Sequence, residues 1–249
     1  MDQKSVVITG GNRGIGLNIT EAFINAGYYV VVGARKELGL CEKFGGNIEF
    51  IPIDVRDENS HIKLAKAAIA KTGKLNVYIN NAGFSEWRPI ENIDDNFLDD
   101  ILATNLKGAF WGCKAAAKVM QDGSNIINIS SIAGKRGSSN NSAYVASKFG
   151  MNGLTQSLAK ELGPKGIRVN ALCPVLVPTD GLIEALKAPF SPAKGDPQGF
   201  ISNFTKANAA LGRLPTGEEI GAMCVLVASD SASAITGQCI NVDCGVFPQ

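Results

Sequence analysis

The sequence of 249 residues contains a single histidine, and this scarcity excludes several kinds of active site. A Ser-His-Asp relay needs a core imidazole, and a multi-histidine metal site needs several of them. His61 lies in the lysine- and alanine-rich stretch SHIKLAKAAIAK, where we expect it on a solvated helical face. We therefore expect no bound metal, and a catalytic acid or base other than imidazole.

Other familiar patterns are missing as well. No run reaches the roughly 20 apolar residues of a membrane span, and the N-terminal MDQKSVVITGG lacks the apolar core of a secretory signal. The net charge is +1, with no basic run of the kind that binds nucleic acid or an anionic membrane. We expect a cytoplasmic protein whose partner is a small molecule.

The cysteines also follow no ligand or redox pattern. None of the six belongs to a C-x-x-C pair, so a zinc site and a disulfide framework are both disfavoured. We expect reduced, mostly buried thiols at Cys41, Cys113, Cys173, Cys224, Cys239 and Cys244.

Hydrophobic patterning predicts the fold class. Short β-branched runs, mostly apolar on both faces, predict seven strands at 5–9, 28–33, 48–53, 76–80, 125–130, 167–173 and 238–242. Helical patterns lie between them at 14–26, 36–44, 58–72, 94–120 with a break near Thr104, 142–162 and 216–228. Helix-ending glycines are expected at Gly27, Gly73, Gly123 and Gly163. This alternation predicts an α/β fold: a Rossmann-type, doubly wound, seven-stranded parallel sheet with helices on both faces, in three layers.

The domain organisation follows from the length and from the lack of any linker or repeat. An α/β chain of this size is commonly one domain, so we expect residues 1–249 to form a single dinucleotide-binding catalytic domain. The one irregular stretch, 179–211, contains Pro189, Pro192 and Pro197. A long interruption of this kind favours a lid over the substrate.

The first predicted strand is followed directly by the glycine-rich segment TGGNRGIG. Its spacing, Gly10-x-x-x-Gly14-x-Gly16, differs from the usual G-x-G-x-x-G. Glycines still permit a tight turn and close backbone approach, and the following helix offers free N–H groups to a pyrophosphate. We therefore predict a dinucleotide site here, the alternative being a glycine turn without a ligand.

The end of the second strand indicates which dinucleotide binds. An acidic residue there would bind the ribose 2′-hydroxyl of NAD, but this chain has Ala34 and Arg35. Arg35, helped by Arg13, can bind a 2′-phosphate with charge-assisted hydrogen bonds, so we predict NADP(H), with NAD(H) possible. Asp54, after the third strand, is placed to accept from the adenine amino group; a helix N-terminal acid is the alternative.

The segment NSAYVASKFG contains Tyr144 and Lys148, four residues apart and hence on one face of a helix. Four tyrosines and 17 lysines would produce this spacing by chance in about a third of such chains. The pair alone is therefore a weak motif, and a surface lysine beside a half-buried tyrosine is the competing interpretation.

Together with the glycine loop and NNAG at 80–83, the Tyr-x-x-x-Lys pattern gives the chain a clear resemblance to the short-chain dehydrogenase/reductase family. The resemblance covers nearly the whole chain and is to the single-domain branch of about 250 residues. It implies a catalytic tetrad, in which the thirteen-residue spacing to the tyrosine selects Ser131 over its neighbour Ser130: Asn105, Ser131, Tyr144 and Lys148.

The resemblance also implies roles for these residues. Tyr144 delivers a proton to the carbonyl oxygen while hydride reduces the carbon, and the Lys148 ammonium lowers the tyrosine pKa from about 10. Lys148 also binds the nicotinamide ribose, Ser131 orients the substrate oxygen, and Asn105 holds a proton-relay water. The expected cofactor contacts are Gly10, Asn12, Arg13, Gly14, Ile15, Gly16, Arg35, Asp54, Val55, Asn81, Ala82, Gly83, Tyr144, Lys148, Pro174, Val177 and Thr179.

Two positions depart from the family pattern. Val175 stands where the strand-end motif usually has glycine, which raises a question about the backbone beside the nicotinamide. Cys244 also replaces a usual glycine, and it bears on packing or subunit contacts more than on chemistry.

The sequence indicates the substrate and the oligomeric state less precisely than the reaction. The resemblance places substrate contacts in FSEWRPIEN and after Thr179, giving as candidates Ser131, Phe84, Trp87, Arg88, Phe190 and Phe200. This mixture suits a sugar, a polyol or a 3-oxoacyl-type carbonyl compound. The resemblance further implies a homotetramer, with a dimer possible, in which the helices at 94–120 and 142–162 form one interface and the C-terminal strand forms another.

Two further functions stay open at this stage. A catalytically silent dinucleotide-binding sensor or scaffold would keep its biological effect when Tyr144 is replaced by phenylalanine. A lyase or isomerase using the same Tyr-Lys pair would form product without net consumption of NADPH.

Overall fold

The computed structural model describes residues 3–248, and its centre is one parallel sheet. The strands are β1 Ser5–Thr9, β2 Tyr29–Ala34, β3 Ile48–Pro52, β4 Val77–Asn80, β5 Asn125–Ile129, β6 Arg168–Pro174 and β7 Cys239–Val242. They lie in the order β3-β2-β1-β4-β5-β6-β7, and every neighbouring pair is parallel. The chain reverses its direction of winding between β1 and β4, and ligands of such sheets bind at this point. The Rossmann-type fold is thus confirmed.

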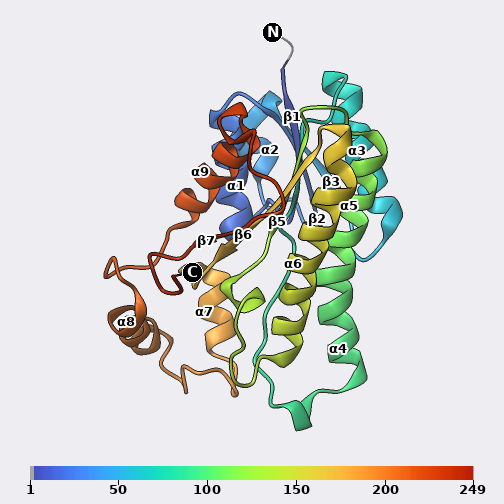
Figure 1. The fold of residues 1–249 in the computed structure, drawn as a ribbon. Helices are drawn as coiled ribbons and strands as arrows, with labels where there is room; N and C mark the ends of the chain where they lie inside the picture. The colour runs from blue at the N-terminus through green and yellow to red at the C-terminus, as the bar shows by residue number, and fades with distance from the viewer. Residues whose placement is uncertain (1–2, 249) are drawn as a thin grey trace.

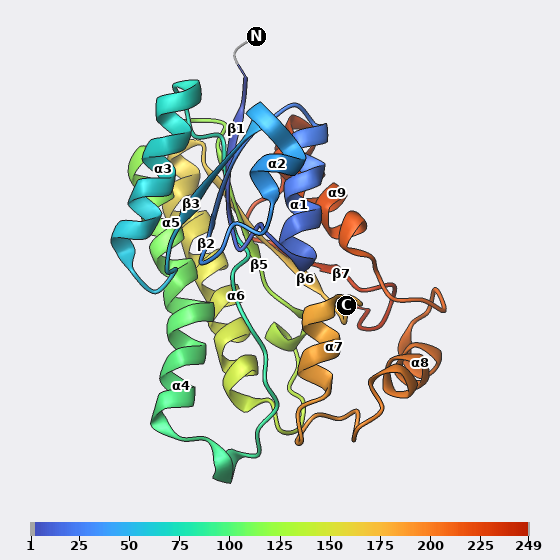
Figure 2. The ribbon, with the colours of Figure 1, turned by 180° about the vertical axis from the view of Figure 1, so that it is seen from behind.

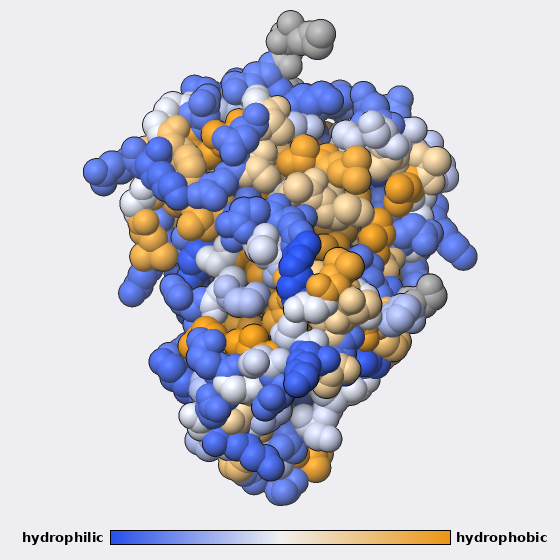
Figure 3. Space-filling model, turned by 90° about the vertical axis from the view of Figure 1, so that its left-hand side faces the viewer, coloured by the Kyte–Doolittle hydropathy of each residue, from blue (hydrophilic) through white to orange (hydrophobic). Residues whose placement is uncertain are grey.

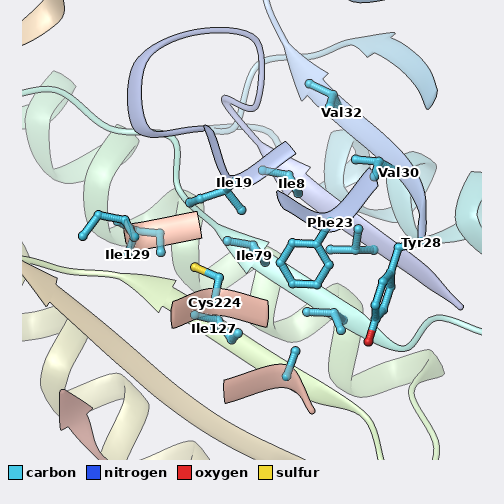
Figure 4. Packing of buried hydrophobic residues seen from close by; sticks show 14 of the residues in the cluster. Ile8, Ile19, Phe23, Tyr28, Val30, Val32, Ile79, Ile127, Ile129 and Cys224 are labelled. Carbon is cyan, nitrogen blue, oxygen red and sulfur yellow. The ribbon is translucent and has the colours of Figure 1, made fainter. Parts of the chain in front are cut away.

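Both faces of the sheet are covered, which explains why its strands are apolar throughout. In β1, Val6 and Ile8 belong to one buried cluster and Val7 to the other, because successive side chains point to opposite faces. Figure 4 shows the first cluster, where Phe23 and Tyr28 meet edge to face with ring centroids 5.0 Å apart.

The helices form two outer layers around the sheet (Figures 1 and 2). One layer holds α1 Gly14–Asn25, α2 Leu40–Phe44 and α9 Gly217–Ala228, which supply the first cluster. The other holds α3 Glu58–Thr72, α5 Gly108–Val119 and α6 Ser142–Leu162, which supply the second cluster. Helix α4, Asp95–Leu102, precedes α5 and packs against α6. None of the helices within 3–248 has the length and apolar character needed to span a membrane.

Helix boundaries agree with the sequence prediction except in three places. The expected break near Thr104 is a π-helical turn, Ala103–Lys107, which joins α4 to α5. Helix α2 starts only at Leu40, because Leu38 and Gly39 have positive φ and the Glu37 carboxylate accepts from the Gly39 N–H. Gly163 is the C-cap of α6 as expected, although its φ is −52° and the left-handed residue is Gly166. The expected helix-ending role of Gly123 was wrong, because α5 has Met120 as its C-cap.

His61 was wrongly expected on a solvated face, since its side chain is completely buried. Nδ1 lies 2.8 Å from the Tyr78 hydroxyl, and Nε2 lies 2.8 Å from the Val55 carbonyl oxygen. A carbonyl only accepts, so Nε2 carries the proton and Nδ1 accepts from Tyr78. Burial lowers the pKa of His61, so the ring is a neutral core residue that ties α3 to the segment after β3.

The segment 179–211 leaves the sheet and carries two helices, α7 Asp180–Leu186 and α8 Pro197–Asn208. Both lie beyond the carboxyl ends of the strands in Figure 1. Leu186 and Ala193 pack with Trp87 in a small buried cluster, which joins this segment to the loop after β4.

The two departures from the family pattern have different structural consequences. Val175 has no left-handed φ and is buried with Ile132, Leu214 and Val246, so the backbone there does not require glycine. Cys244 has φ of 55°, in the region that favours glycine, so this position carries some backbone strain. All six cysteines are free thiols, of which Cys113, Cys173 and Cys224 are buried and Cys41 is exposed.

Candidate active site

The expected site residues come from separate parts of the chain and meet at the carboxyl edge of the sheet. The glycine loop follows β1, Arg35 follows β2, and Asp54 follows β3. On the other side of the switch point, the NNAG segment covers the end of β4 and Ser131 follows β5. Because parallel strands end at one edge, these residues gather around the switch point, where sheets of this kind bind their ligands.

The glycine loop is tightly folded and leaves no room for a side chain at Gly16. Gly10 has φ of +66°, and a Cβ at Gly16 would lie 2.0 Å from the Gly10 carbonyl oxygen. Arg13, which precedes the first turn of α1, makes no side-chain cap, and that turn contains no acidic residue. The amides at the start of α1 therefore remain available to an anion, and the loop fits a dinucleotide.

The loop is held in place by the NNAG segment. The Asn81 side chain donates to the carbonyl oxygens of Thr9 and Gly10 at 2.9 and 3.1 Å. The Thr9 hydroxyl accepts from the backbone N–H groups of Asn81 and Ala82. These bonds cross between β1 and β4 and hold the loops that follow these two strands together.

The region beyond β2 holds the two arginines that the sequence predicted to bind a 2′-phosphate. Arg13 and Arg35 are both exposed, and their loops are linked by a 2.7 Å hydrogen bond from the Asn12 side chain to the Lys36 carbonyl oxygen. No acidic residue stands at the end of β2, where an NAD-specific site would have one.

The segment after β3 contains Asp54 and Val55. Both carboxylate oxygens of Asp54 accept from Arg56, with distances between 2.6 and 3.1 Å. Hydrogen bonds from the Arg56 side chain hold the pKa of Asp54 below its usual value, and the charge of Arg35 acts in the same direction. Asp54 is therefore ionised and able to accept.

Tyr144 and Ser131 are brought together by α6 and the loop after β5. The Ser131 side chain lies near enough to Tyr144 to lower the pKa of its hydroxyl. The Ser131 hydroxyl also accepts from the Ala133 N–H at 3.0 Å and lies 3.5 Å from the Pro174 carbonyl oxygen. Ser130, by contrast, is buried and donates to the Lys148 carbonyl oxygen. The geometry thus agrees with the spacing argument for Ser131.

The titration of Tyr144 differs from the expectation. Burial raises its pKa, and the Ser131 side chain acts in the opposite direction. The Lys148 ammonium donates to the Ile129 carbonyl oxygen at 2.8 Å and lies 5.6 Å from the centre of the Tyr144 ring. Burial lowers the pKa of Lys148 to about 8. At neutral pH, Tyr144 is protonated, which is the form that a proton donor needs.

Asn105 is fully buried within the π-helical turn. Its Oδ1 accepts from the Phe84 N–H at 3.0 Å, and its Nδ2 donates to the Phe84 carbonyl oxygen at 2.8 Å and to Ser147 at 3.3 Å. Both amide hydrogens are used, so towards a relay water this side chain could act only as an acceptor. Asn105 anchors the loop that follows Gly83.

Thr179 lies beside the glycine loop. A Cβ at Gly14 would lie 3.7 Å from the Thr179 methyl group. The Thr179 hydroxyl accepts from the Leu182 N–H as the N-cap of α7 and retains its own hydrogen for a ligand. Val177 is buried in the first cluster, and the Pro174 carbonyl faces Ser131.

Comparison with known proteins decides the family. A family model described as enoyl-(acyl carrier protein) reductase matches residues 10–247. A crystal structure of a short-chain dehydrogenase/reductase from Brucella melitensis, called a glucose/ribitol dehydrogenase, superposes with a TM-score of 0.90 at 27% identity, covering 100% of this chain and 98% of that one. The chain belongs to the short-chain dehydrogenase/reductase family. It is an oxidoreductase that acts on alcohol and carbonyl groups.

Other relatives of this short-chain dehydrogenase/reductase have varied names. A "Probable galactose dehydrogenase" of Rhizobium meliloti is 34% identical and covers 98% of this chain and 95% of its own. A 3-oxoacyl-[acyl-carrier-protein] reductase of Chlamydia muridarum is also 34% identical, over 98% and 97% of the two chains. An actinorhodin polyketide ketoreductase solved with NADPH has a TM-score of 0.89 at 29% identity, covering 98% of this chain and 97% of its own.

The expected substrate residues of this family member are differently placed. Phe84 is 37% exposed beside Asn105, and Phe190 is 41% exposed in the 179–211 segment. Trp87 is buried against α7 and α8, in a cluster that also includes Phe200. Arg88 bonds Glu86 at 2.6 Å and stacks on the Phe97 ring at 4.0 Å. Phe84 is thus more open to a ligand than Trp87 or Arg88.

Three contributors to the site escaped the sequence reasoning. Thr9 binds two backbone amides of the NNAG segment, Ser147 binds Asn105, and Arg56 binds Asp54. The role of Arg56 could have been predicted from the sequence, because a basic side chain two residues after an acidic one at the end of a strand can form an ion pair with it. The bonds of Thr9 and Ser147 depend on tertiary placement and have no local signal.

Proposed function

We propose that the chain is an NADP(H)-dependent oxidoreductase that interconverts a ketone and a secondary alcohol by hydride transfer. The observation that carries this proposal is that Ser131, Tyr144 and buried Lys148 gather at the carboxyl edge of the sheet. Ser131 acts on the pKa of Tyr144, and the Lys148 ammonium lies 5.6 Å from the centre of its ring. The bound cofactor would supply or accept the hydride. The chain's own residues bind, orient and move a proton.

The proton step belongs to Tyr144. Its protonated hydroxyl donates to the developing alkoxide during reduction, and the resulting phenolate accepts a proton during oxidation. Ser131 can donate to the same substrate oxygen, which fixes that oxygen within reach of the tyrosine. Lys148 places its positive charge near the ring and so opposes the cost of forming a buried phenolate.

The cofactor preference rests on the two exposed arginines. Replacing Arg35 with alanine should weaken NADPH binding about 10- to 100-fold, because a charge-assisted contact to the 2′-phosphate is lost, and should leave NADH binding within about twofold. Calorimetric titration at matched ionic strength measures both affinities. Arg213→Ala, which removes an exposed arginine paired with Glu219, serves as the control and should change neither. Tighter binding of NADH than of NADPH by the wild-type protein would overturn the preference.

For the substrate we propose a sugar, a polyol or a 3-oxoacyl-type carbonyl compound. The names of the galactose dehydrogenase, glucose/ribitol dehydrogenase and 3-oxoacyl reductase relatives support this range. We also propose that residues 1–249 act as one catalytic domain in the cytoplasm, in line with six free thiols, and that 179–211 is its lid.

For the assembly we propose a homotetramer. Phe110 of α5 and Phe149 of α6 are each about half exposed, which suits burial against a second copy. Leu226 of α9 is also half exposed. Helix α9 lies on the left-hand side of Figure 1, which Figure 3 turns to the viewer, and apolar residues form patches on that face.

The test of the function is a screen of sugars, polyols and 3-oxoacyl thioesters against the purified protein, following the absorbance of NADPH and of NADH. We expect at least one class to show cofactor-coupled turnover, faster with the phosphorylated cofactor. Product formation without any change in cofactor absorbance would favour a lyase or isomerase instead.

A further inference from the structure

In the segment Asp54–Arg56 the backbone is fixed by the protein core, but the Asp54 side chain is not. The Val55 carbonyl oxygen accepts from buried His61 at 2.8 Å, and a Cβ at Gly108 would lie 3.1 Å from that same oxygen. The backbone is thus fixed by the core of the protein. The Asp54 side chain is 42% exposed, so nothing in the core determines where its carboxylate points.

Arg56 holds the Asp54 side chain in place. Its backbone N–H donates to Oδ1 of Asp54 at 2.9 Å, and its Nε and terminal nitrogen reach Oδ2 at 2.9 and 2.6 Å. Its other terminal nitrogen donates to Asp100 of α4 at 2.8 Å. The planar guanidinium is therefore gripped between two carboxylates that lie on different elements, and it cannot rotate without breaking one of these contacts.

This arrangement leaves Asp54 with a limited and directed capacity to accept. An ionised carboxylate has about four lone-pair sites, and the backbone N–H and the guanidinium fork occupy most of them. An exposed ion pair contributes little to stability, so the hydrogen bonds among Asp54, Arg56 and Asp100 are not explained by folding stability alone. A single remaining acceptor site with a fixed direction is what recognition of one N–H donor requires.

We propose that Arg56 is a positioning residue for the cofactor, which aims the Asp54 carboxylate at the amino group of the adenine ring, and that Asp100 braces it from α4. The inference rests on the proposed NADP(H) function. It adds the residue that determines how strongly the site prefers adenine to a base without the amino group. Arg56 itself acts through Asp54.

The experiment compares NADPH with its hypoxanthine analogue, deamino-NADPH, in which an oxo group replaces the adenine amino group. Affinities are measured by calorimetric titration of the whole protein. The wild type should bind NADPH at least about tenfold more tightly, because the oxo group presents no donor to the ionised carboxylate. Asp54→Ala removes the carboxylate and so gives the ratio of the two affinities that is expected when the adenine amino group is not recognised.

Arg56→Met should reduce the discrimination to within about threefold, mainly by weakening NADPH binding. Arg56→Lys keeps the positive charge but loses the planar guanidinium, which makes two parallel hydrogen bonds. It should therefore retain only part of the preference for NADPH over deamino-NADPH. Asp100→Asn should lower it partially, whereas Asp99→Asn, an exposed neighbour on the same helix, should not. Lys114→Met, which breaks the exposed pair with Glu58, controls for loss of an ion pair as such.

The outcomes separate this inference from the function on which it rests. If both dinucleotides bind and Arg56→Met retains the wild-type ratio, the positioning role is refuted while the cofactor site stands. If the wild type binds neither dinucleotide, the proposed function fails as well. A Tm of Arg56→Met close to that of the wild type, together with a collapsed ratio, supports positioning over a general loss of structure.

Discussion

Replacing Tyr144 with phenylalanine should lower kcat by about 10³-fold or more, since the substitution removes the hydroxyl that delivers the proton in the proposed mechanism. The phenyl ring preserves the packing within α6, so the protein should fold normally. Affinity for NADPH should change by no more than about threefold, because the glycine loop and the residues after β2 and β3 are untouched. Steady-state kinetics on a substrate found in the screen, with calorimetry for the cofactor, measures both quantities.

A matched control is available on β2. Tyr29→Phe removes a hydroxyl that contacts Glu49 at 3.3 Å, far along the sheet from Ser131, and should retain wild-type turnover. Full activity of Tyr144→Phe would show that the proton comes from elsewhere and would refute the mechanism. An inactive variant that also failed to bind NADPH would point to a structural role.

Replacing Lys148 with methionine should lower kcat about 10²-fold or more, because the phenolate of Tyr144 would form in a buried site without a neighbouring positive charge. The same change should make the protein more stable near neutral pH. Burial lowers the pKa of Lys148 from 10.5 to about 8, so the folded state holds this proton less tightly than the unfolded chain does.

The sign of the pH dependence follows from that lowered pKa. Below about pH 8 the charged ammonium is buried at full cost, and between about pH 8 and 10.5 the cost falls as the folded state loses its proton first. Methionine avoids a penalty of about 1–3 kcal/mol after allowance for the lost bond to Ile129, which corresponds to a Tm higher by roughly 2–8 °C. The gain should shrink as the pH approaches 10.5.

Thermal unfolding of the wild type and the variant at pH 7 and pH 10 measures this gain. Lys160→Met, at an exposed position on the same helix, controls for the change of side chain and should show neither effect. A Lys148→Met variant less stable than the wild type at pH 7 would contradict the assignment of Lys148 as a strained, functional cation.

The fold could be predicted from the sequence because each strand has a recognisable local pattern of residues. A strand covered on both faces reads as a continuous β-branched run, as in Val6–Ile8, and helix ends such as Gly73 have a local conformational cause. The features that were mispredicted depend on tertiary contacts. His61 sits in a polar-looking helix, and only the position of Tyr78 on β4 makes its burial possible.

The candidate site was accessible to the extent that motifs fix both residue type and spacing. Ser131 was selected over Ser130 by spacing, and the two side chains indeed point to different partners. The tyrosine pKa was not accessible, because it depends on how deeply the ring is buried. Trp87 was equally ambiguous, since an aromatic in a loop can face a ligand or a packing partner, and here it packs against the 179–211 segment.

The most direct test of hydride transfer with Tyr144 as the proton donor uses NADPH deuterated at the transferring position, with any carbonyl compound that the screen identifies. The account predicts one NADP⁺ formed per alcohol, deuterium on the carbinol carbon of the product, and loss of both signals together in Tyr144→Phe. Product formed without deuterium and without consumption of NADPH would contradict it.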